Sequence, residues 1–416
     1  MLPAFWLASL DRNAYKVNYE FFEIARCMSI TANNTLLIIA ILAVGVQDIG
    51  GGAASPALAD IMKAMPAVAP TTIMLITTIP TLGQVIMSLF FGKLTEHFKK
   101  RSLFFFASAL FLVSGLTPFF LNAMIPILAC RFVLGLSVGI FVPMGVTLIT
   151  DFFDDPQAIN RMNGLNITVA CFGGMVFQMV GGFLAKINWH YCFLAYLSSI
   201  IVFLIVFFWM PEPPKKVITV AASKGKMPGT VYRIAVLYGL ANMIMMAIVT
   251  NNSVSIVMNG YGDAGTAGIS LTGYTAGGLI GGILFGYIAK LCKRQAVSLG
   301  YLLAVIGFGL AFLAVNAEMI IIGTFIVGIS LGTIIPAFYE KIQRSAPPAL
   351  IGAGIGLACS MQGLGQFFQA IIYDPILKAV GGPGKPAFGV SAVVFAVLFI
   401  MTVFAAAAKK DRAAVR

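Results

Sequence analysis

Charged residues are scarce in this chain. Asp, Glu, Lys and Arg make up 10% of the 416 residues, whereas apolar residues make up 59% and the mean hydropathy is +0.95. Water-soluble globular domains carry about 25% charged residues, so this composition excludes them. Lipid must therefore be the solvent for most of the surface, and a helix needs about 20 apolar residues to cross it.

The chain also lacks the side chains that catalysis and metal binding use. It has two histidines, His97 and His190, and its six cysteines are scattered singly with no C-x-x-C pair. This pattern predicts no metal site, no disulfide framework and no catalytic residues. The phosphate-binding pattern G-x-x-x-x-G-K-[ST] is absent too, which excludes ATP as the direct energy source. We expect neither an enzyme nor a bound cofactor.

The apolar residues fall into about twelve segments that are long enough to cross a bilayer, with charged or Gly- and Pro-rich breaks between them. They predict an all-α membrane protein with two six-helix bundles, over residues 34–210 and 230–408. Residues 211–229 are rich in Pro and Lys and predict a cytoplasmic linker. Residues 1–33 are expected to form a cytoplasmic or interfacial segment, and residues 409–416 a cytoplasmic tail.

An internal duplication supports two similar bundles. Residues 131–144 recur in register as residues 324–337, and this places Gly135 on Gly328 and Gly139 on Gly332. Small residues four positions apart let helices approach closely in lipid, so we interpret these glycines as packing positions. The glycine run at residues 50–52 is expected to loosen the first span near its outer half.

The basic residues sort to one side of the predicted membrane. Of the 27 Lys and Arg residues, the only exceptions are Lys63, Lys186, Lys378 and Lys385 in outer loops and Arg131 within a span. The positive-inside rule then predicts that both termini are cytoplasmic. We expect the membrane to be the plasma membrane. The same rule accounts for the net charge of +12, so no nucleic-acid partner is expected. The expected partners are the bilayer and a small-molecule substrate, bound by a monomer.

The segment that follows the second span reads GKLTEHFKKR, over residues 92–101. It resembles the signature G-x-L-x-D-R-x-G-R-[RK] of the major facilitator superfamily, with Glu96, His97 and Lys99 in place of its Asp, Arg and second Gly. Further features of the family are matched, in order, by Arg131-x-x-x-Gly135-x-x-x-Gly139, Gly181-Gly182 before Trp189–Phe193, and Met210-Pro211-Glu212. The resemblance covers the whole chain and implies a transporter whose two halves rock around a central site.

The resemblance also implies a cytoplasmic gate made by Gly92, Glu96, Lys100 and Arg101. In the family, the acidic residue docks on the amino-terminal end of the eleventh helix, which here lies near residues 347–349. A helix amino terminus carries about half a positive charge, so it attracts a carboxylate. The alternative is a solvated basic loop that reflects topology alone.

Two charged residues within the predicted spans are the main functional candidates, since each costs several kcal/mol if it faces lipid unpaired. Burial favours the protonated form of a carboxylate, so Asp48 could gain and lose a proton and couple transport to a proton gradient. The alternative for Asp48 is a structural pair with Arg131 or a neighbouring helix. Arg131 could bind an anionic substrate, form the interior structural and proton-relay contact that the resemblance implies, or extend outward to the membrane interface.

Uncharged amides at mid-span positions complete the predicted site, because they can bind a solute without the cost of a charge; individually, each is more often a contact between helices. The predicted substrate-binding residues are Gln47, Asp48, Arg131, Asn166, Gln178, Asn242, Asn251, Asn252, Gln362 and Gln366.

These residues predict a secondary transporter for a small organic solute, an organic anion, by proton-coupled symport. Sodium remains possible as the coupling ion. The alternative is proton-coupled efflux of lipophilic drugs or metabolites. Drug exporters of the family often carry G-x-x-x-G-P-x-x-G-G in the fifth helix, and residues 173–182 lack its proline. A sensor or a passive pore of the same fold is also left open.

Overall fold

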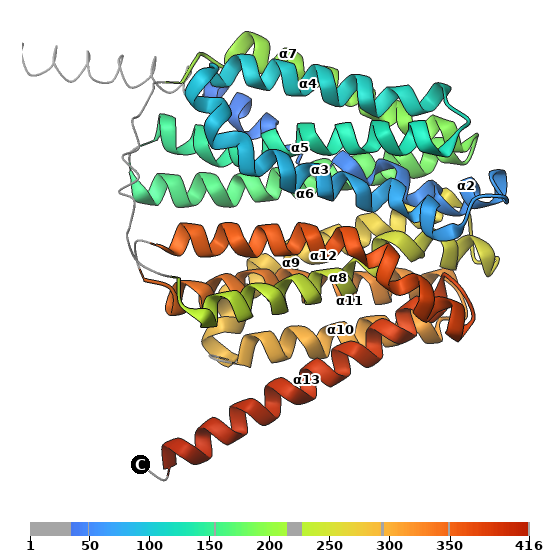
Figure 1. Cartoon of the computed structure of the whole chain (residues 1–416), viewed down its shortest axis with the longest axis vertical. Coiled ribbons are helices and arrows are strands. Elements are labelled where there is room, and N and C mark those ends of the chain that lie inside the picture. The colour runs from blue at the N-terminus through green and yellow to red at the C-terminus, as the bar shows by residue number, and fades with distance from the viewer. Residues whose placement is uncertain are drawn as a thin grey trace, which may run out of the picture.

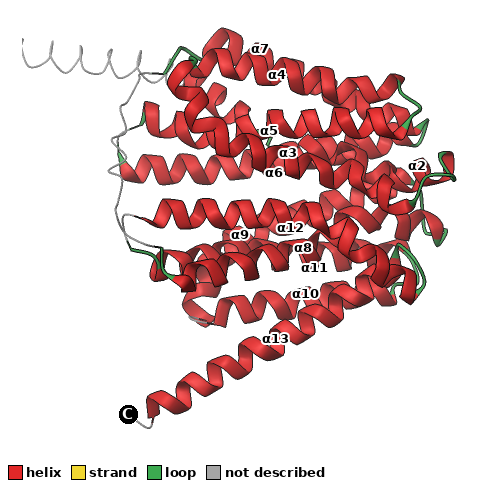
Figure 2. Cartoon of the chain, in the orientation of Figure 1, coloured by secondary structure: helices red, strands yellow, loops and turns green. Residues whose placement is uncertain are grey.

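The structure is a computed structural model that describes residues 35–48, 50–153, 155–213, 227–292, 295–347 and 350–414. The predicted amino-terminal segment, most of the linker and the last residues of the tail lie outside these ranges. Within them, every regular element is a helix (Figure 2). Their bounds are Thr35–Gly45, η1 Gly50–Ala57, α2 Leu58–Ala64, α3 Pro70–His97, α4 Lys100–Leu116, η2 Thr117–Phe120, α5 Met124–Phe152, α6 Pro156–Ala185, η3 Trp189–Ser198, α7 Ser199–Trp209, α8 Gly229–Met258, α9 Ala264–Cys292, α10 Ala296–Leu313, α11 Ala317–Ser345, α12 Ile351–Val380 and α13 Lys385–Ala414.

The described part of the chain has 11 helices that are long and apolar enough to cross a membrane, or up to 12 if the bent pair Thr35–Gly45 and Gly50–Ala64 counts as one span. The two parts of that pair meet at 43°. The break falls directly before the glycine run at residues 50–52, where the sequence predicted a loosened first span. The all-α membrane fold predicted from hydropathy is confirmed.

The buried side chains form two main cores. One is drawn mostly from residues 40–210, and the other lies within residues 231–398. In Figure 1 the blue-to-green half of the chain lies above the yellow-to-red half, and the long helices of both halves run side by side. The two halves meet where α3 packs on α12 and α6 packs on α9. The limits assigned to the two bundles, 34–210 and 230–408, stay predictions.

The duplicated glycines make equivalent contacts in both halves. A methyl group on Gly135 of α5 would overlap the Pro80 carbonyl of α3, and one on Gly328 of α11 would overlap the Tyr274 carbonyl of α9. Gly139 and Gly332 make the next contacts along the same two helix pairs, with the backbones of Gln84 and Gly278. Because lipid offers no hydrophobic drive for helix association, this close backbone packing holds each pair together.

The structure corrects one local expectation. Residues 92–101 are not a loop, because α3 continues to His97 and α4 begins at Lys100. Only Phe98 and Lys99 separate the two helices. The last residues of α3 are charged and continue the helix beyond its apolar part. Most of their side chains are exposed.

Replacing Gly135 with alanine should destabilise the protein by about 1–3 kcal/mol, because the added methyl group forces α3 and α5 apart. The control is Gly309→Ala in α10, where a methyl group would meet nothing within 4 Å. Thermal unfolding in detergent gives the unfolding temperature of each variant. Equal unfolding temperatures for the two variants would contradict the packing role of Gly135.

Candidate functional site

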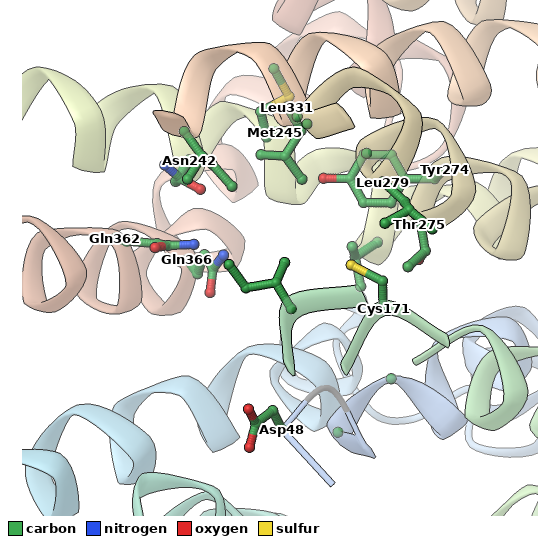
Figure 3. A pocket seen from close by; sticks show the side chains of 18 of the residues that line it. Asp48, Cys171, Asn242, Met245, Tyr274, Thr275, Leu279, Leu331, Gln362 and Gln366 are labelled. Atoms are coloured by element: carbon green, nitrogen blue, oxygen red, sulfur yellow. The ribbon is translucent and has the colours of Figure 1, made fainter. Parts of the chain in front are cut away.

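A cavity of about 880 Å³ lies between the two halves and is lined by both. The first half contributes residues of the broken first span and of α3, α5 and α6, and the second half contributes residues of α8, α9, α11 and α12. Figure 3 shows Asp48 on one wall, with Asn242, Gln362 and Gln366 across the cavity from it. The volume suits a small organic molecule, since ligand pockets span about 300–1,000 Å³.

Asp48 faces this cavity because the first span stops being an α-helix just before it. The backbone N–H of Asp48 donates to the Gly45 carbonyl at 3.1 Å, and that of Gly50 donates to the Gln47 carbonyl at 3.2 Å. These tighter bonds between residues three apart continue into η1. The Asp48 Oδ1 atom has no hydrogen-bond partner. This oxygen is itself buried, while the residue as a whole lies on the cavity wall.

Half of the predicted substrate-binding residues line the cavity. They are Asp48, Gln178, Asn242, Gln362 and Gln366. Gln178 also connects the two halves, because its Oε1 accepts a hydrogen bond from the Thr275 hydroxyl at 3.0 Å. The structure therefore brings the acidic residue of the first span together with amides of α6, α8 and α12.

Arg131 lies away from the cavity lining. Its side chain is fully buried, its Nη1 donates to the Tyr196 hydroxyl at 2.6 Å, and its guanidinium lies 5.2 Å from the ring centres of Phe193 and Tyr196. No ion pair joins Arg131 to Asp48, because the Asp48 Oδ1 and the Arg131 Nε and Nη2 all lack partners. This geometry is that of an interior structural contact, and a proton-relay role for Arg131 stays a prediction.

The other four predicted amides are also buried outside the lining. Asn251 accepts a hydrogen bond from the Gly384 N–H at 2.9 Å, and Asn252 donates to the Ala267 carbonyl at 3.2 Å, so both join helices of the second half. Asn166 packs against Gly45 and Gly145, and the side-chain amide of Gln47 has no partner. These four residues join helices or fill the interior of a half.

The predicted gate residues lie at the end of the molecule that carries residues 210–213 and 227–228, here called the linker end. Lys100 forms an ion pair with the buried Asp151, and its backbone N–H donates to Glu212 at 3.0 Å. Arg101 donates to the Phe207 carbonyl at 2.7 Å. All of these contacts stay within the first half.

Glu96 and Gly92 are exposed at the same end. Among the described residues, Glu96 forms no hydrogen bond or ion pair, and a methyl group on Gly92 would meet nothing within 4 Å. The proposed docking position for Glu96 includes Pro348 and Ala349, which lie outside the described residues. The predicted latch is therefore not formed by the part of the gate that the structure describes.

The opposite end of the molecule is held shut by contacts between the halves. The Ser253 hydroxyl of α8 donates to the Pro56 carbonyl at 2.5 Å and accepts from the Ala59 N–H at 3.3 Å. Thr71 at the start of α3 donates to Asp374 of α12. The two Ser253 bonds satisfy a carbonyl of η1 and an N–H at the start of α2, so the broken first span is part of the contact that closes this end.

An ion pair adds to this seal. The Lys186 Nζ lies 3.0 Å from an Asp263 carboxylate oxygen, and it joins the end of α6 to the start of α9. Partial burial raises the pKa of Asp263, but hydrogen bonds from Thr266 and Lys186 outweigh this and lower it. The pair is thus charged at neutral pH and is lost only in acid, as the pH falls through that lowered pKa. Because both side chains are partly exposed, it contributes at most about 1 kcal/mol.

The cavity opens toward the linker end. Its lining reaches the exposed Arg161 near the start of α6 and Tyr339 near the end of α11. The inter-half bonds of Ser253, Thr71 and Lys186 all lie at the other end. The structure is therefore open at the linker end and closed at the other end. This is one of the two conformations that a rocking mechanism requires.

Sequence reasoning missed several residues of the site. Tyr274, Thr275 and Met245 line the cavity, yet an aromatic, hydroxyl or thioether side chain in a span usually packs against other helices or lipid. The sealing residues Ser253, Lys186 and Asp263 could not be paired from sequence. Asp151 offered a clear signal, because it is an acid at the very end of a predicted span.

Replacing Ser253 with alanine should shift the population toward a form that is open at the sealed end. The change removes two inter-half hydrogen bonds and leaves the Pro56 carbonyl unsatisfied, at a cost of about 1–3 kcal/mol. Distances between spin labels at Lys63→Cys and Asn259→Cys measure the opening. Ser255→Ala is the matched control, since the Ser255 hydroxyl is buried on the same helix without a partner. Identical distance distributions for the two variants would show that the Ser253 bonds do not hold this end shut.

A family model described as Major Facilitator Superfamily matches residues 36–370, with a second match over residues 234–415. A search of curated proteins found no match.

Solved structures with the same fold include three transporters. A bacterial homologue of the human lysosomal transporter Spinster, inward-facing and unoccupied, is 14% identical, with a TM-score of 0.70 over 89% of this chain and 95% of that one. A D-xylose-proton symporter is 14% identical, with a TM-score of 0.66 over 87% and 97%. The human organic anion transporter MFSD10 is 14% identical, with a TM-score of 0.60 over 88% and 98%. At these identities the likeness shows the fold alone.

Proposed function

The chain belongs to the major facilitator superfamily, and we propose that it moves a small organic solute by alternating access, coupled to a proton carried on Asp48. As a member of this family it is an integral membrane transporter and not an enzyme. The observation that carries the proposal is the Asp48 carboxylate, which faces the cavity between the halves with one oxygen unpartnered.

Alternating access would depend on the contacts between the halves that close one end of the molecule. In the form described here, the cavity that Asp48 lines opens toward the linker end, while the bonds of Ser253, Thr71 and Lys186 close the other end. Breaking those bonds and closing the linker end would expose the same carboxylate to the opposite compartment. We place the linker end and both termini in the cytoplasm of a plasma-membrane protein, following the distribution of Lys and Arg.

The part of the cavity lining that the structure describes offers a single carboxyl group, that of Asp48. The described residues contain no group of three or more His, Cys, Asp or Glu side chains that could hold a metal ion. One unpartnered carboxylate can still bind a proton. We therefore propose proton-coupled symport as the main mode, by a monomer that needs no cofactor.

Efflux of lipophilic compounds is the second candidate. Apolar side chains such as Met245, Leu279 and Leu331 line much of the cavity and would suit an oily solute. Export would use the same carboxylate and the same two conformations, with the solute and the proton moving in opposite directions. Solute flux measured under an imposed pH gradient separates the two modes by its sign.

Replacing Asp48 with asparagine should abolish pH-driven solute accumulation in liposomes and leave exchange without a gradient partly intact, because the amide keeps the shape but cannot carry the proton. Asp60→Asn is the control, since that carboxylate pairs with Lys63 outside the cavity lining. Accumulation by Asp48→Asn at the rate of the unaltered protein would remove Asp48 as the proton carrier.

Replacing Glu96 with glutamine should favour the form that is open at the linker end, if Glu96 docks on a helix terminus when that end is shut. An exposed carboxylate at a helix terminus is worth about 0.3–1 kcal/mol, so the population ratio should change by about two- to fivefold. The readout is thiol labelling of Thr168→Cys in the cavity lining. Glu318→Gln, at the opposite end, is the control. Unchanged labelling would exclude the latch.

A further inference from the structure

The charge distribution of the cavity limits the kind of solute that it can bind. Among its lining residues, Asp48 and Arg161 are the only members of the Asp, Glu, Lys and Arg group. Arg161 is exposed near the start of α6, at the mouth. Arg131, the cation on which an anionic solute was expected to depend, is buried under Phe193 and Tyr196 and outside the lining.

This distribution disfavours a charged solute. A carboxylate held at the centre would meet no cation there, and it would lie near Asp48 or beside apolar side chains. A cationic solute would compete with the proton for Asp48, which conflicts with symport. An uncharged solute leaves Asp48 free to carry the proton.

The second half presents a defined set of hydrogen-bonding groups. Asn242 donates its amide N–H to the Tyr238 carbonyl at 2.9 Å, which leaves its Oδ1 as an acceptor. Gln362 accepts from the Tyr238 hydroxyl at 3.0 Å, which leaves its Nε2 as a donor. Gln366 makes no hydrogen bond within the described residues and offers both groups. In Figure 3 these three amides lie close together, and the Tyr274 hydroxyl points into the same space.

We infer that the solute is uncharged, with hydrogen-bond donors and acceptors along one edge and an apolar body, and that Asn242, Gln362 and Gln366 recognise that edge. The inference rests on the proposed function, in which Asp48 carries the proton. The apolar side chains around the amides suit the body of such a solute and disfavour a polyol, whose hydroxyl groups would be left unpaired there.

Three compounds with related indole skeletons test the charge class: indole-3-acetamide, indole-3-acetate and tryptamine, which are neutral, anionic and cationic at pH 7. Their binding to the full chain in detergent is measured by calorimetry without any gradient. We expect the amide to bind at least about tenfold more tightly than the acetate, because the acetate would bury its charge with no cation beside it. We expect the amide also to bind more tightly than tryptamine, because a protonated Asp48 offers the ammonium group no counter-charge. Tighter binding of the acetate or the amine overturns the inference, and so does binding of none of the three.

Substitutions in the amide set test the recognition residues. Gln366→Leu should weaken indole-3-acetamide binding by about two- to tenfold, as expected for the loss of one or two neutral hydrogen bonds. Gln366→Glu should move the preference toward tryptamine by adding a negative charge. Gln343→Leu, exposed at the end of α11 and outside the lining, is the control and should change neither. Unaltered amide binding in both Gln366 variants overturns the assignment.

The assignment of the proton to Asp48 and the inference of an uncharged solute can each fail without the other. Binding without a gradient does not depend on coupling, so selective amide binding can persist even if Asp48→Asn still accumulates solute. In that case the proton assignment fails and the solute class stands. If Asp48→Asn loses accumulation and indole-3-acetate is the preferred ligand, the proton assignment stands and the inferred solute class is wrong.

Discussion

The structure depends on one break in one helix. A carboxylate within a bilayer is tolerated only where water or a polar partner reaches it. In an unbroken first span, Asp48 would lie against its own helix and the adjacent helices. The span instead leaves α-helical geometry after Gly45 and resumes as η1 at Gly50, so that Asp48 faces the cavity. Gly50 has a structural role there, because a side chain at this position would collide with Phe111.

The same break explains how the far end of the molecule is closed. The backbone of η1 and of the start of α2 offers a carbonyl at Pro56 and an N–H at Ala59, and Ser253 of the second half bonds both. The element that places the carboxylate in the cavity is thus also one of the elements that join the halves at this end. Movement of one half against the other must change the surroundings of Asp48 and the seal together, which is what coupling between a proton and a conformational change requires.

Much of this fold could be predicted from sequence, because the bilayer forces helices and fixes their length. The apolar segments of the described residues form the long helices. The duplicated glycines, interpreted from sequence as packing positions, make the close contacts between α3 and α5 and between α9 and α11. The site was harder. Asp48 and Gln366 line the cavity, but Arg131 and Asn251 carry equally polar side chains and turn into the interior of a half. Hydropathy gives the depth of a residue in the membrane and not the direction in which its side chain points. Contacts between the halves, such as Lys186 with Asp263, join segments whose pairing no local pattern encodes.

The most direct test of the central claim is the protonation state of Asp48 itself. Infrared difference spectroscopy of the protein in lipid, recorded as the pH is changed across the range that a cell maintains, detects the carbonyl band of a protonated carboxyl group. The proposed mechanism predicts a band that rises and falls within that range and disappears in Asp48→Asn. A carboxyl signal that does not change with pH, or one that survives unchanged in Asp48→Asn, would contradict proton transfer at Asp48.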